Sequence, residues 1–260
     1  MTKKILFFDF DGTIISDRTG LIPPSALEIL RRLDQAGHIL ILNTGRTRAI
    51  LDPITHTLKF HGRILGCGSY VEYCDDTIYQ AYVDEAIHTQ LLKKLEAFSV
   101  EAFLEGSDHL YVTEGITSGR LLHHIKTYKE NHVNICPVGI GMEFQKMFIY
   151  YRKPQYEASF RAFISQYFEY IDRGRGCAEL VIKHHSKATG IQKILDVLDM
   201  TKEDCYVFGD SNNDIPMFNF IKNSILIGGE NPELKDMVLF AGADVDHDGL
   251  FRAVYECGIL

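Results

Sequence analysis

Several features that mark other classes of protein are missing from this sequence of 260 residues. The 6 cysteines form no C-x-x-C pair, which argues against a zinc knuckle or a dithiol redox site and fits single thiols in a reducing compartment. No apolar run approaches the ~20 residues that a membrane-spanning helix needs. Two aspartates interrupt the apolar run near the start, so we expect no signal peptide and a cytoplasmic protein without a membrane partner.

The sequence also lacks an excess of positive charge. It has 27 Lys and Arg against 35 Asp and Glu, a net charge of −8. Because nucleic acids and anionic membranes bind mainly through clustered basic residues, neither is expected as a partner. A small anionic ligand remains compatible with this charge, since local charge can differ from the total. The hydrophobic fraction of 46% is enough for a buried core and excludes wholesale disorder.

Short apolar runs alternate with helical patterns at both ends of the chain. Residues 5–8 and 39–42 are continuous apolar runs, which are typical of strands buried on both faces of a parallel sheet. Between them, Ser25 and Glu28 have capping-box spacing that predicts the start of a helix. The same alternation recurs from about residue 187 onward. The pattern predicts an α/β fold with a doubly wound, Rossmann-like parallel sheet.

The middle of the chain has a different texture. Between residues 84 and 183 the predicted helices and strands carry almost none of the candidate functional residues. We interpret this segment as an inserted α+β domain. The expected organisation is therefore a catalytic core made of residues 1–83 and 184–260, interrupted by a cap domain over residues 84–183.

Two aspartates, Asp9 and Asp11, come directly after the first predicted strand. Residues two apart on a strand point to the same face, and neighbouring carboxylates repel unless a cation lies between them. The carboxyl ends of parallel strands also border the crevice in which ligands bind. The pair fits a Mg²⁺ site in which one carboxylate is a nucleophile. It fits equally a polar strand end with a turn at Asp11-Gly12.

Polar residues follow two further strands. Thr44 follows the second strand, where a hydroxyl can hold phosphate or cap a helix. A later strand ends in the segment 209–214, Gly-Asp-Ser-Asn-Asn-Asp, in which helix capping explains one acidic residue but not both. Lys187 opens a predicted helix, where the helix dipole disfavours a cation, although most lysines are simply exposed. Together these residues offer the acid, hydroxyl and amide groups that a Mg²⁺-assisted phosphoryl site needs.

In this order, Asp-x-Asp-Gly-Thr, Thr, Lys and Gly-Asp-x-x-Asn-Asp resemble the motifs of the haloacid dehalogenase (HAD) superfamily of phosphatases. The sequence is most similar to the Cof-type subgroup, whose large α/β cap is inserted between the second and third motifs, and the similarity covers the whole chain. One departure concerns the loop after the third core strand. Subgroup members often carry Asn-Gly-Ala there, whereas this chain has Cys67-Gly68-Ser69, which keeps the glycine and loses the amide.

The resemblance implies a role for each motif residue. Asp9 would be the nucleophile that forms an aspartyl-phosphate, and Asp11 the general acid and base. The phosphoryl group would be held by the Phe10 backbone N–H, Thr44, the Gly45 backbone, Lys187 and Asn213. The Mg²⁺ ion would be held by Asp9, the Asp11 backbone carbonyl and Asp210, with Asp214 beside them, as a ligand or through water or Lys187.

These assignments predict a Mg²⁺-dependent phosphatase acting on a small phosphorylated metabolite, such as a sugar phosphate or a nucleotide, as a monomer or homodimer. A phosphomutase of the same superfamily would return the phosphate to a sugar hydroxyl. A catalytically silent sugar-phosphate-binding regulator is a third reading, against which the intact chemical positions count. A two-component receiver domain is disfavoured because receivers have no large insertion.

Two groups of residues outside the motifs allow alternatives. Arg173 and Arg175 are candidates for binding a second anionic group of the substrate, although a glycine-rich hairpin explains their segment as well. The histidine pairs at 123–124 and 184–185 suggest a transition metal. We interpret them as solvated, since adjacent helical residues do not face each other and no carboxylate has ligand spacing.

Overall fold

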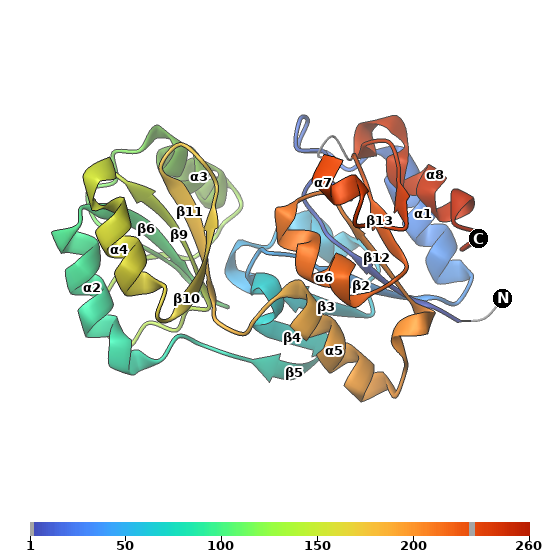
Figure 1. The fold of residues 1–260 in the computed structure, drawn as a ribbon, viewed down its shortest axis with the longest axis horizontal. Coiled ribbons are helices and arrows are strands. Elements are labelled where there is room, and N and C mark those ends of the chain that lie inside the picture. Colours follow the sequence, from blue (N-terminus) through green and yellow to red (C-terminus); the bar gives the residue numbers. More distant parts are fainter. Residues whose placement is uncertain (1–2, 229–231) are drawn as a thin grey trace. The chain divides into compact units, whose positions relative to one another are not determined.

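The computed structural model describes residues 3–228 and 232–260 and divides them into two compact units. The first unit contains the residues up to Gly45, residues 54–80 and the residues from Ser186 onward. The second contains Arg46–Pro53 and Ala81–His185. Each unit is built around its own β-sheet (Figure 1). Within the described residues, every helix is too short or too polar to span a bilayer.

The first unit holds an eight-stranded sheet in the order β14-β13-β12-β1-β2-β3-β4-β5. Its strands are β1 (Ile5–Phe8), β2 (Ile39–Asn43), β3 (Gly62–Leu65), β4 (Tyr70–Tyr73), β5 (Asp76–Gln80), β12 (Cys205–Gly209), β13 (Ser224–Leu226) and β14 (Phe240–Ala241). The strands from β14 to β3 run parallel, and β4 and β5 extend the sheet antiparallel. Because β12, β1 and β2 are neighbours, the residues that follow these three strands emerge side by side at one edge of the sheet.

Helices cover both faces of this sheet. They are α1 (Pro24–Gln35), α5 (Lys187–Leu198), α6 (Ile215–Phe220), α7 (Pro232–Lys235) and α8 (Gly249–Glu256). The helices α5 and α6 pack on the face that includes Ile5 and Phe7 of β1. The helices α1 and α8 pack against each other, and α1 also contacts β2 (Figure 1). Both β1 and β2 are fully buried, as their continuous apolar runs predicted, and the doubly wound α/β fold is confirmed.

The start of α1 differs from the prediction. The helix begins at Pro24, and no side chain caps its first turn. The capping box predicted for Ser25 and Glu28 is therefore wrong. Proline suits the first helical position because its missing N–H would be unsatisfied there anyway. Glu28 instead pairs with Arg31 at 2.8 Å and with Arg32 at 2.7 Å along the exposed face of the helix.

The second unit holds a six-stranded sheet in the order β10-β11-β9-β6-β7-β8. Its elements are β6 (Val100–Glu105), β7 (Leu110–Val112), β8 (Ile135–Pro137), β9 (Lys146–Tyr151), β10 (Phe168–Asp172), β11 (Cys177–Ile182), α2 (His88–Ala97), α3 (Gly119–Glu130) and α4 (Glu157–Ile164). The helices α2 and α4 bury one face of the sheet, with Leu91 and Phe160 in the shared core. The helix α3 contributes Leu121 to a separate cluster with Phe103.

One short segment departs from the expected division of the chain. Residues Arg46–Pro53 were expected in the core, but they pack with the second unit. Ile50 lies in the apolar cluster that contains Phe103, and the Arg48 guanidinium pairs with the Asp108 carboxylate. The pattern of apolar residues shows that Ile50 is buried without showing against which part of the chain, so this boundary was missed.

Candidate active site

Asp9 emerges from the centre of the first sheet at the end of β1. Its backbone N–H donates to the carbonyl of Phe208 on β12 at 2.8 Å, which continues the parallel ladder one residue beyond the strand. The residue is only 3% exposed. Burial raises the pKa of Asp9 to about 7 even though the charge of Lys187 acts to lower it. An ionised carboxylate at this position therefore needs positive partners.

Lys187 is one such partner. It is the first residue of α5, and the reciprocal hydrogen bonds of a capping box between Ser186 and Thr189 hold the start of the helix. The Nζ atom lies 2.5 Å from Asp9 Oδ1 and 2.6 Å from Asp214 Oδ1. Burial alone would lower the pKa of Lys187, but the charges of Asp214 and Asp9 outweigh it and the net shift is upward. The buried ammonium therefore stays charged.

Asp214 joins Lys187 to the end of β12. One of its carboxylate oxygens accepts a hydrogen bond from the Lys187 ammonium. The other accepts hydrogen bonds from the backbone N–H groups of Asp210 and Ser211, both at 3.0 Å. A Cβ atom at Gly209 would lie 2.4 Å from Asp214 Cγ, so only glycine allows this close approach. The Gly-Asp-x-x-Asn-Asp motif is thus a tight turn that its own last aspartate closes.

Asp210 completes a cluster of carboxylates. Oxygen atoms of Asp9, Asp210 and Asp214 all lie within 4.8 Å of one another. Burial, followed by the negative charges of Asp9 and Asp214, raises the pKa of Asp210 to about 9. At Gly12, where φ is +75°, a Cβ atom would lie 2.5 Å from Asp210 Oδ2. When all three carboxylates are ionised, one ammonium leaves net negative charge, which a divalent cation with oxygen ligands would offset.

Thr44 lies at the end of β2 and is 1% exposed. Its N–H donates to the carbonyl of Ile64 at 2.9 Å, and its carbonyl accepts the N–H of Cys67 at 3.2 Å. Cys67 has a left-handed backbone with φ of 54°, a conformation that costs most residues other than glycine about 1–2 kcal/mol. The loop that departs from Asn-Gly-Ala therefore holds Thr44, and with it Gly45, through the backbone.

The other motif residues lie around this cluster. The Phe10 side chain is fully buried, and its carbonyl accepts the N–H of Ile15 at 3.0 Å. Asp11 forms an isolated β-bridge with Ile15, so the chain turns sharply after it. Asn213 is half-buried, and its amide oxygen accepts the Ser211 hydroxyl at 2.9 Å. Motifs from three neighbouring strand ends and one helix start thus meet in the first unit.

Comparison with known proteins assigns the chain to a family. Residues 6–254 match the haloacid dehalogenase-like hydrolases. The chain belongs to this family. Among its relatives, YkrA of Bacillus subtilis, described as a candidate phosphatase, is 30% identical over 269 aligned positions that cover all of both chains. The 5-amino-6-(5-phospho-D-ribitylamino)uracil phosphatase YitU of the same species is 25% identical, with 98% of each chain covered.

The solved structures agree on the fold. The HAD subclass IIB sugar phosphatase BT4131 is 24% identical and aligns with a TM-score of 0.84 over 99% of this chain and 100% of its own. The superfamily resemblance inferred from the motifs is therefore confirmed, and the chain is a phosphatase of the HAD family.

Asn43 is a part of this HAD site that the sequence did not reveal. Its side chain is fully buried, and its amide Nδ2 donates to the backbone carbonyl of Lys187 at 3.3 Å. It therefore ties the end of β2 to the start of α5. The only available signal was a polar residue at the end of an otherwise apolar strand.

The candidates outside the motifs belong to the second unit. Arg173 Nη2 is 3.0 Å from Glu179 Oε2, and Arg175 is exposed in the turn of the hairpin that joins β10 and β11. The glycine-rich segment is thus a hairpin, as the plainer interpretation predicted. Across residues 3–228 and 232–260, the histidine pairs at 123–124 and 184–185 join no group of three or more potential metal ligands.

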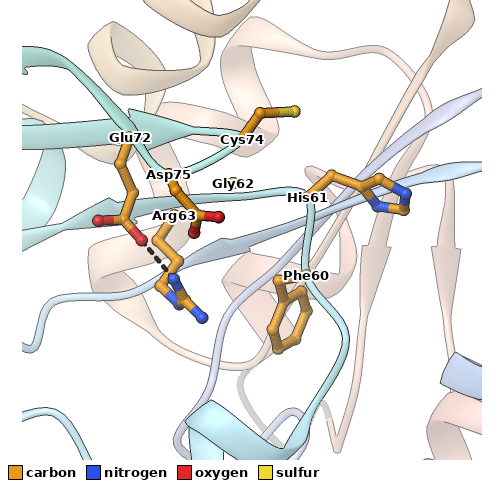
Figure 2. A pocket seen from close by; sticks show the side chains of 7 residues that line it. All are labelled: Phe60, His61, Gly62, Arg63, Glu72, Cys74 and Asp75. Atoms are coloured by element: carbon orange, nitrogen blue, oxygen red, sulfur yellow. Dashed lines mark hydrogen bonds and ion pairs between the residues drawn. The ribbon is translucent and has the colours of Figure 1, made fainter.

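A separate pocket of about 260 Å³ lies beside β3 and β4 (Figure 2). Its lining residues are Phe60, His61, Gly62, Arg63, Glu72, Cys74 and Asp75. Inside it, the Arg63 guanidinium forms an ion pair with the Glu72 carboxylate. The pocket contains none of the HAD motif residues.

Proposed function

We propose that the protein is a Mg²⁺-dependent phosphatase that hydrolyses a small phosphorylated metabolite through an aspartyl-phosphate on Asp9. The observation that carries this proposal is the buried Lys187 ammonium between the carboxylates of Asp9 and Asp214. A carboxylate attacks an anionic phosphate ester only when the repulsion between them is offset. The ammonium at 2.5 Å from Asp9 supplies part of that offset.

The residues present fit a magnesium ion. Asp9, Asp210 and the backbone carbonyl of Asp11 would hold it, because Mg²⁺ prefers oxygen ligands and shares them with substrate phosphate and water. The raised pKa values of Asp9 and Asp210 support this, since burial and neighbouring negative charge disfavour their ionised forms until a cation binds. When bound, Mg²⁺ neutralises charge on the transferring phosphoryl group. Asp214 acts on Lys187 and on the turn, because both of its oxygens already accept hydrogen bonds.

The reaction has two steps. In the first, a carboxylate oxygen of Asp9 bonds to phosphorus, the bond from phosphorus to the leaving oxygen breaks, and Asp11 gives that oxygen its proton. In the second, a water oxygen bonds to phosphorus while Asp11 takes a proton from the water and the bond between Asp9 and phosphorus breaks. Inorganic phosphate leaves, and both carboxyl groups return to their starting protonation states.

The remaining motif residues orient the phosphoryl group. We assign its oxygens to the Thr44 hydroxyl, the backbone N–H groups of Phe10 and Gly45, the Asn213 amide and Lys187. Phosphoryl transfer depends on positioning and charge neutralisation more than on covalent chemistry. The backbone hydrogen bonds that hold Thr44 on both sides support its role, because they fix the backbone from which its hydroxyl projects.

We assign the choice of substrate to the inserted segment, residues 84–183. None of the residues assigned to the phosphoryl group lies in it, so the core over residues 1–83 and 184–260 is generic for phosphate monoesters. The substrate is a small phosphorylated metabolite such as a sugar phosphate or a nucleotide. The names of the relatives, which include a phosphatase of a phosphoribityl-uracil compound, support this size class.

A panel of phosphorylated metabolites, incubated with the protein and Mg²⁺, tests the proposal by the release of inorganic phosphate. We expect release from one or a few members of the panel and none with Asp9→Asn. Transfer of the phosphate to a second sugar hydroxyl, without free phosphate, would identify a phosphomutase instead. Tight binding of a sugar phosphate with no turnover would identify a silent regulator.

A further inference from the structure

Asp246 lies in the turn before α8 and binds the segment that follows Asp11. Its Oδ2 atom accepts the Ser16 hydroxyl at 2.9 Å and the Arg18 Nε–H at 3.2 Å. Ser16 is buried, with 1% exposure, whereas the Arg18 side chain is 74% exposed. Exposed ion pairs contribute little, so the hydrogen bond to Ser16 is the structurally important contact.

Short backbone contacts join Ser16 to Asp11. The residue before Ser16, Ile15, forms the β-bridge with Asp11, and its carbonyl accepts the Gly12 N–H at 2.9 Å. The Ser16 hydroxyl oxygen also accepts the backbone N–H of Arg18 at 3.2 Å, which closes the turn on itself. The position of Ser16 therefore bears on the backbone that carries the Asp11 carboxyl group.

The turn that carries Asp246 is a well-packed support. The Gly249 N–H donates to the Asp244 carbonyl at 3.0 Å, and the Gly228 N–H donates to the Ala243 carbonyl at 3.0 Å. A Cβ atom at Gly249 would lie 1.9 Å from the Ala243 oxygen, so this backbone path requires glycine. The turn cannot shift without breaking these contacts.

The two segments also line one pocket of about 760 Å³. Gly12 and Arg18 line it from the segment after Asp11, Asp244 and Asp246 line it from the turn, and Asp210 of the carboxylate cluster borders it as well. The hydrogen bond between Ser16 and Asp246 joins these two segments beside the catalytic carboxylates.

We propose that Asp246 is a positioning residue that, through Ser16, holds the Asp11 carboxyl group on the leaving oxygen of the substrate. This inference rests on the proposed function, because it requires Asp11 to be the general acid. In this role Asp246 acts through the Ser16 hydroxyl and not on the reacting atoms themselves. Its effect is confined to the geometry of proton transfer.

The substrate dependence of the loss tests this role. A misplacement of about 1 Å can cost a reaction about 10²-fold. Asp246→Ala is therefore expected to lower kcat/KM for an alkyl phosphate by roughly 10- to 100-fold. For nitrophenyl phosphate, whose leaving group needs no proton, kcat/KM should change by less than about twofold. We choose kcat/KM because it compares the transition state with free enzyme and substrate.

Five further variants separate positioning from other effects. Ser16→Ala should reproduce the selective loss, and the double variant should lose no more than either single variant. Asp246→Asn retains an oxygen acceptor for Ser16 and should restore most of the activity. Asp248→Asn removes the same charge from an exposed position of the same turn and should leave kcat/KM unchanged for both substrates. Arg18→Ala should behave as Asp248→Asn does.

Equal losses on both substrates would show that Asp246 serves only folding, and no loss on either would show that Asp11 does not depend on it; each result overturns the inference. If Asp246→Ala does not fold, Ser16→Ala supplies the same comparison. Trapping of a phosphoenzyme from the unmodified protein tests the proposed function separately. If the unmodified protein forms a phosphoenzyme, but Asp246→Ala leaves the ratio of kcat/KM for the two substrates unchanged, only the role of Asp246 is overturned.

Discussion

The Lys187 ammonium, at the start of α5, lies 2.5 Å from Asp9 Oδ1, at the end of β1, and both side chains are buried. The same ammonium lies 2.6 Å from Asp214 Oδ1. One cation thus serves two carboxylates that come from different strand ends. Its removal would leave both carboxylates in a medium that solvates them poorly.

Lys187→Met should abolish phosphate release and destabilise the protein. Removing one partner of a buried ion pair costs about 3–5 kcal/mol. Protonation of Asp9 can relieve part of this cost, because its pKa is already raised. The loss of folding stability should therefore be smaller at about pH 5 than at about pH 8. Urea unfolding at both pH values measures it. Lys193→Met in the same helix is the control and should keep its activity. Activity of Lys187→Met within tenfold of normal would contradict the assignment.

The two aspartates that follow β1 should show different defects. Asp9→Asn should form no covalent phosphoenzyme, because the amide is not a nucleophile. Asp11→Asn should lower the turnover rate by roughly 10²–10⁴-fold, the usual range for general acid–base catalysis. The decrease should be smallest with nitrophenyl phosphate, whose leaving group needs no proton. Acid quenching with labelled substrate measures the intermediate. A hydroxylamine-sensitive phosphoenzyme in Asp9→Asn would show that the nucleophile is another residue.

Magnesium should be essential for activity. Without a cation, Asp9 and Asp210 are either protonated, which removes the nucleophile, or ionised, which repels an anionic substrate. A chelator should therefore stop phosphate release, and Mg²⁺ should restore it. Calcium should inhibit, because its larger and more flexible coordination shell misplaces the nucleophile. Full turnover in excess chelator would refute the metal requirement.

The same carboxylates predict how stability depends on pH. Folding raises the pKa of Asp9 from 3.8 to about 7 and that of Asp210 from 3.8 to about 9. From pH 3.8 up to about 9, the folded protein therefore binds more protons than the unfolded chain. Stability of the metal-free protein should therefore fall as pH rises through this window, and Mg²⁺ should oppose the fall. Thermal unfolding with chelator or with Mg²⁺ measures both effects. Asp210→Asn should weaken them, and identical pH curves with and without Mg²⁺ would count against binding at this site.

Gly68→Ala should disturb the position of Lys187. Gly68 has a φ of +88°, and a Cβ atom there would lie 2.2 Å from the carbonyl oxygen of Ser186, the residue before Lys187. Gly37→Ala is a matched control, since φ there is +85° and no atom lies within 4 Å of the added carbon. The control should cost only the backbone strain of about 1–2 kcal/mol. Gly68→Ala should cost more and also reduce kcat. Equal effects in unfolding and turnover assays would exclude the steric contact as the cause.

Arg175 is the exposed arginine of the hairpin between β10 and β11. Arg175→Ala should raise KM for a substrate with a second anionic group and leave nitrophenyl phosphate turnover nearly unchanged. Arg173 is a poorer candidate because Glu179 already binds its guanidinium. Steady-state kinetics on both substrates checks the prediction. Equal losses would indicate a folding defect, and no loss would remove Arg175 from the candidates.

Much of the candidate site was predictable from the sequence because of one topological rule. The carboxyl ends of parallel strands share an edge of the sheet, so Asp9, Thr44 and Asp210 were expected together once their strands were recognised. The strands themselves were recognisable because helices on both sides of a sheet require continuous apolar runs. The order of the motifs then identified the family.

What the sequence determined by itself was therefore the set of strands, the polar residues at their ends and the family to which they belong. Only the tertiary structure decided that Ile50 packs with the second unit, that Asn43 binds the Lys187 carbonyl and that Asp246 holds Ser16. Each of these contacts joins residues far apart in sequence. Local patterns record whether a residue is apolar or polar, whereas its partner is chosen by the packing of the folded chain, which no local pattern contains.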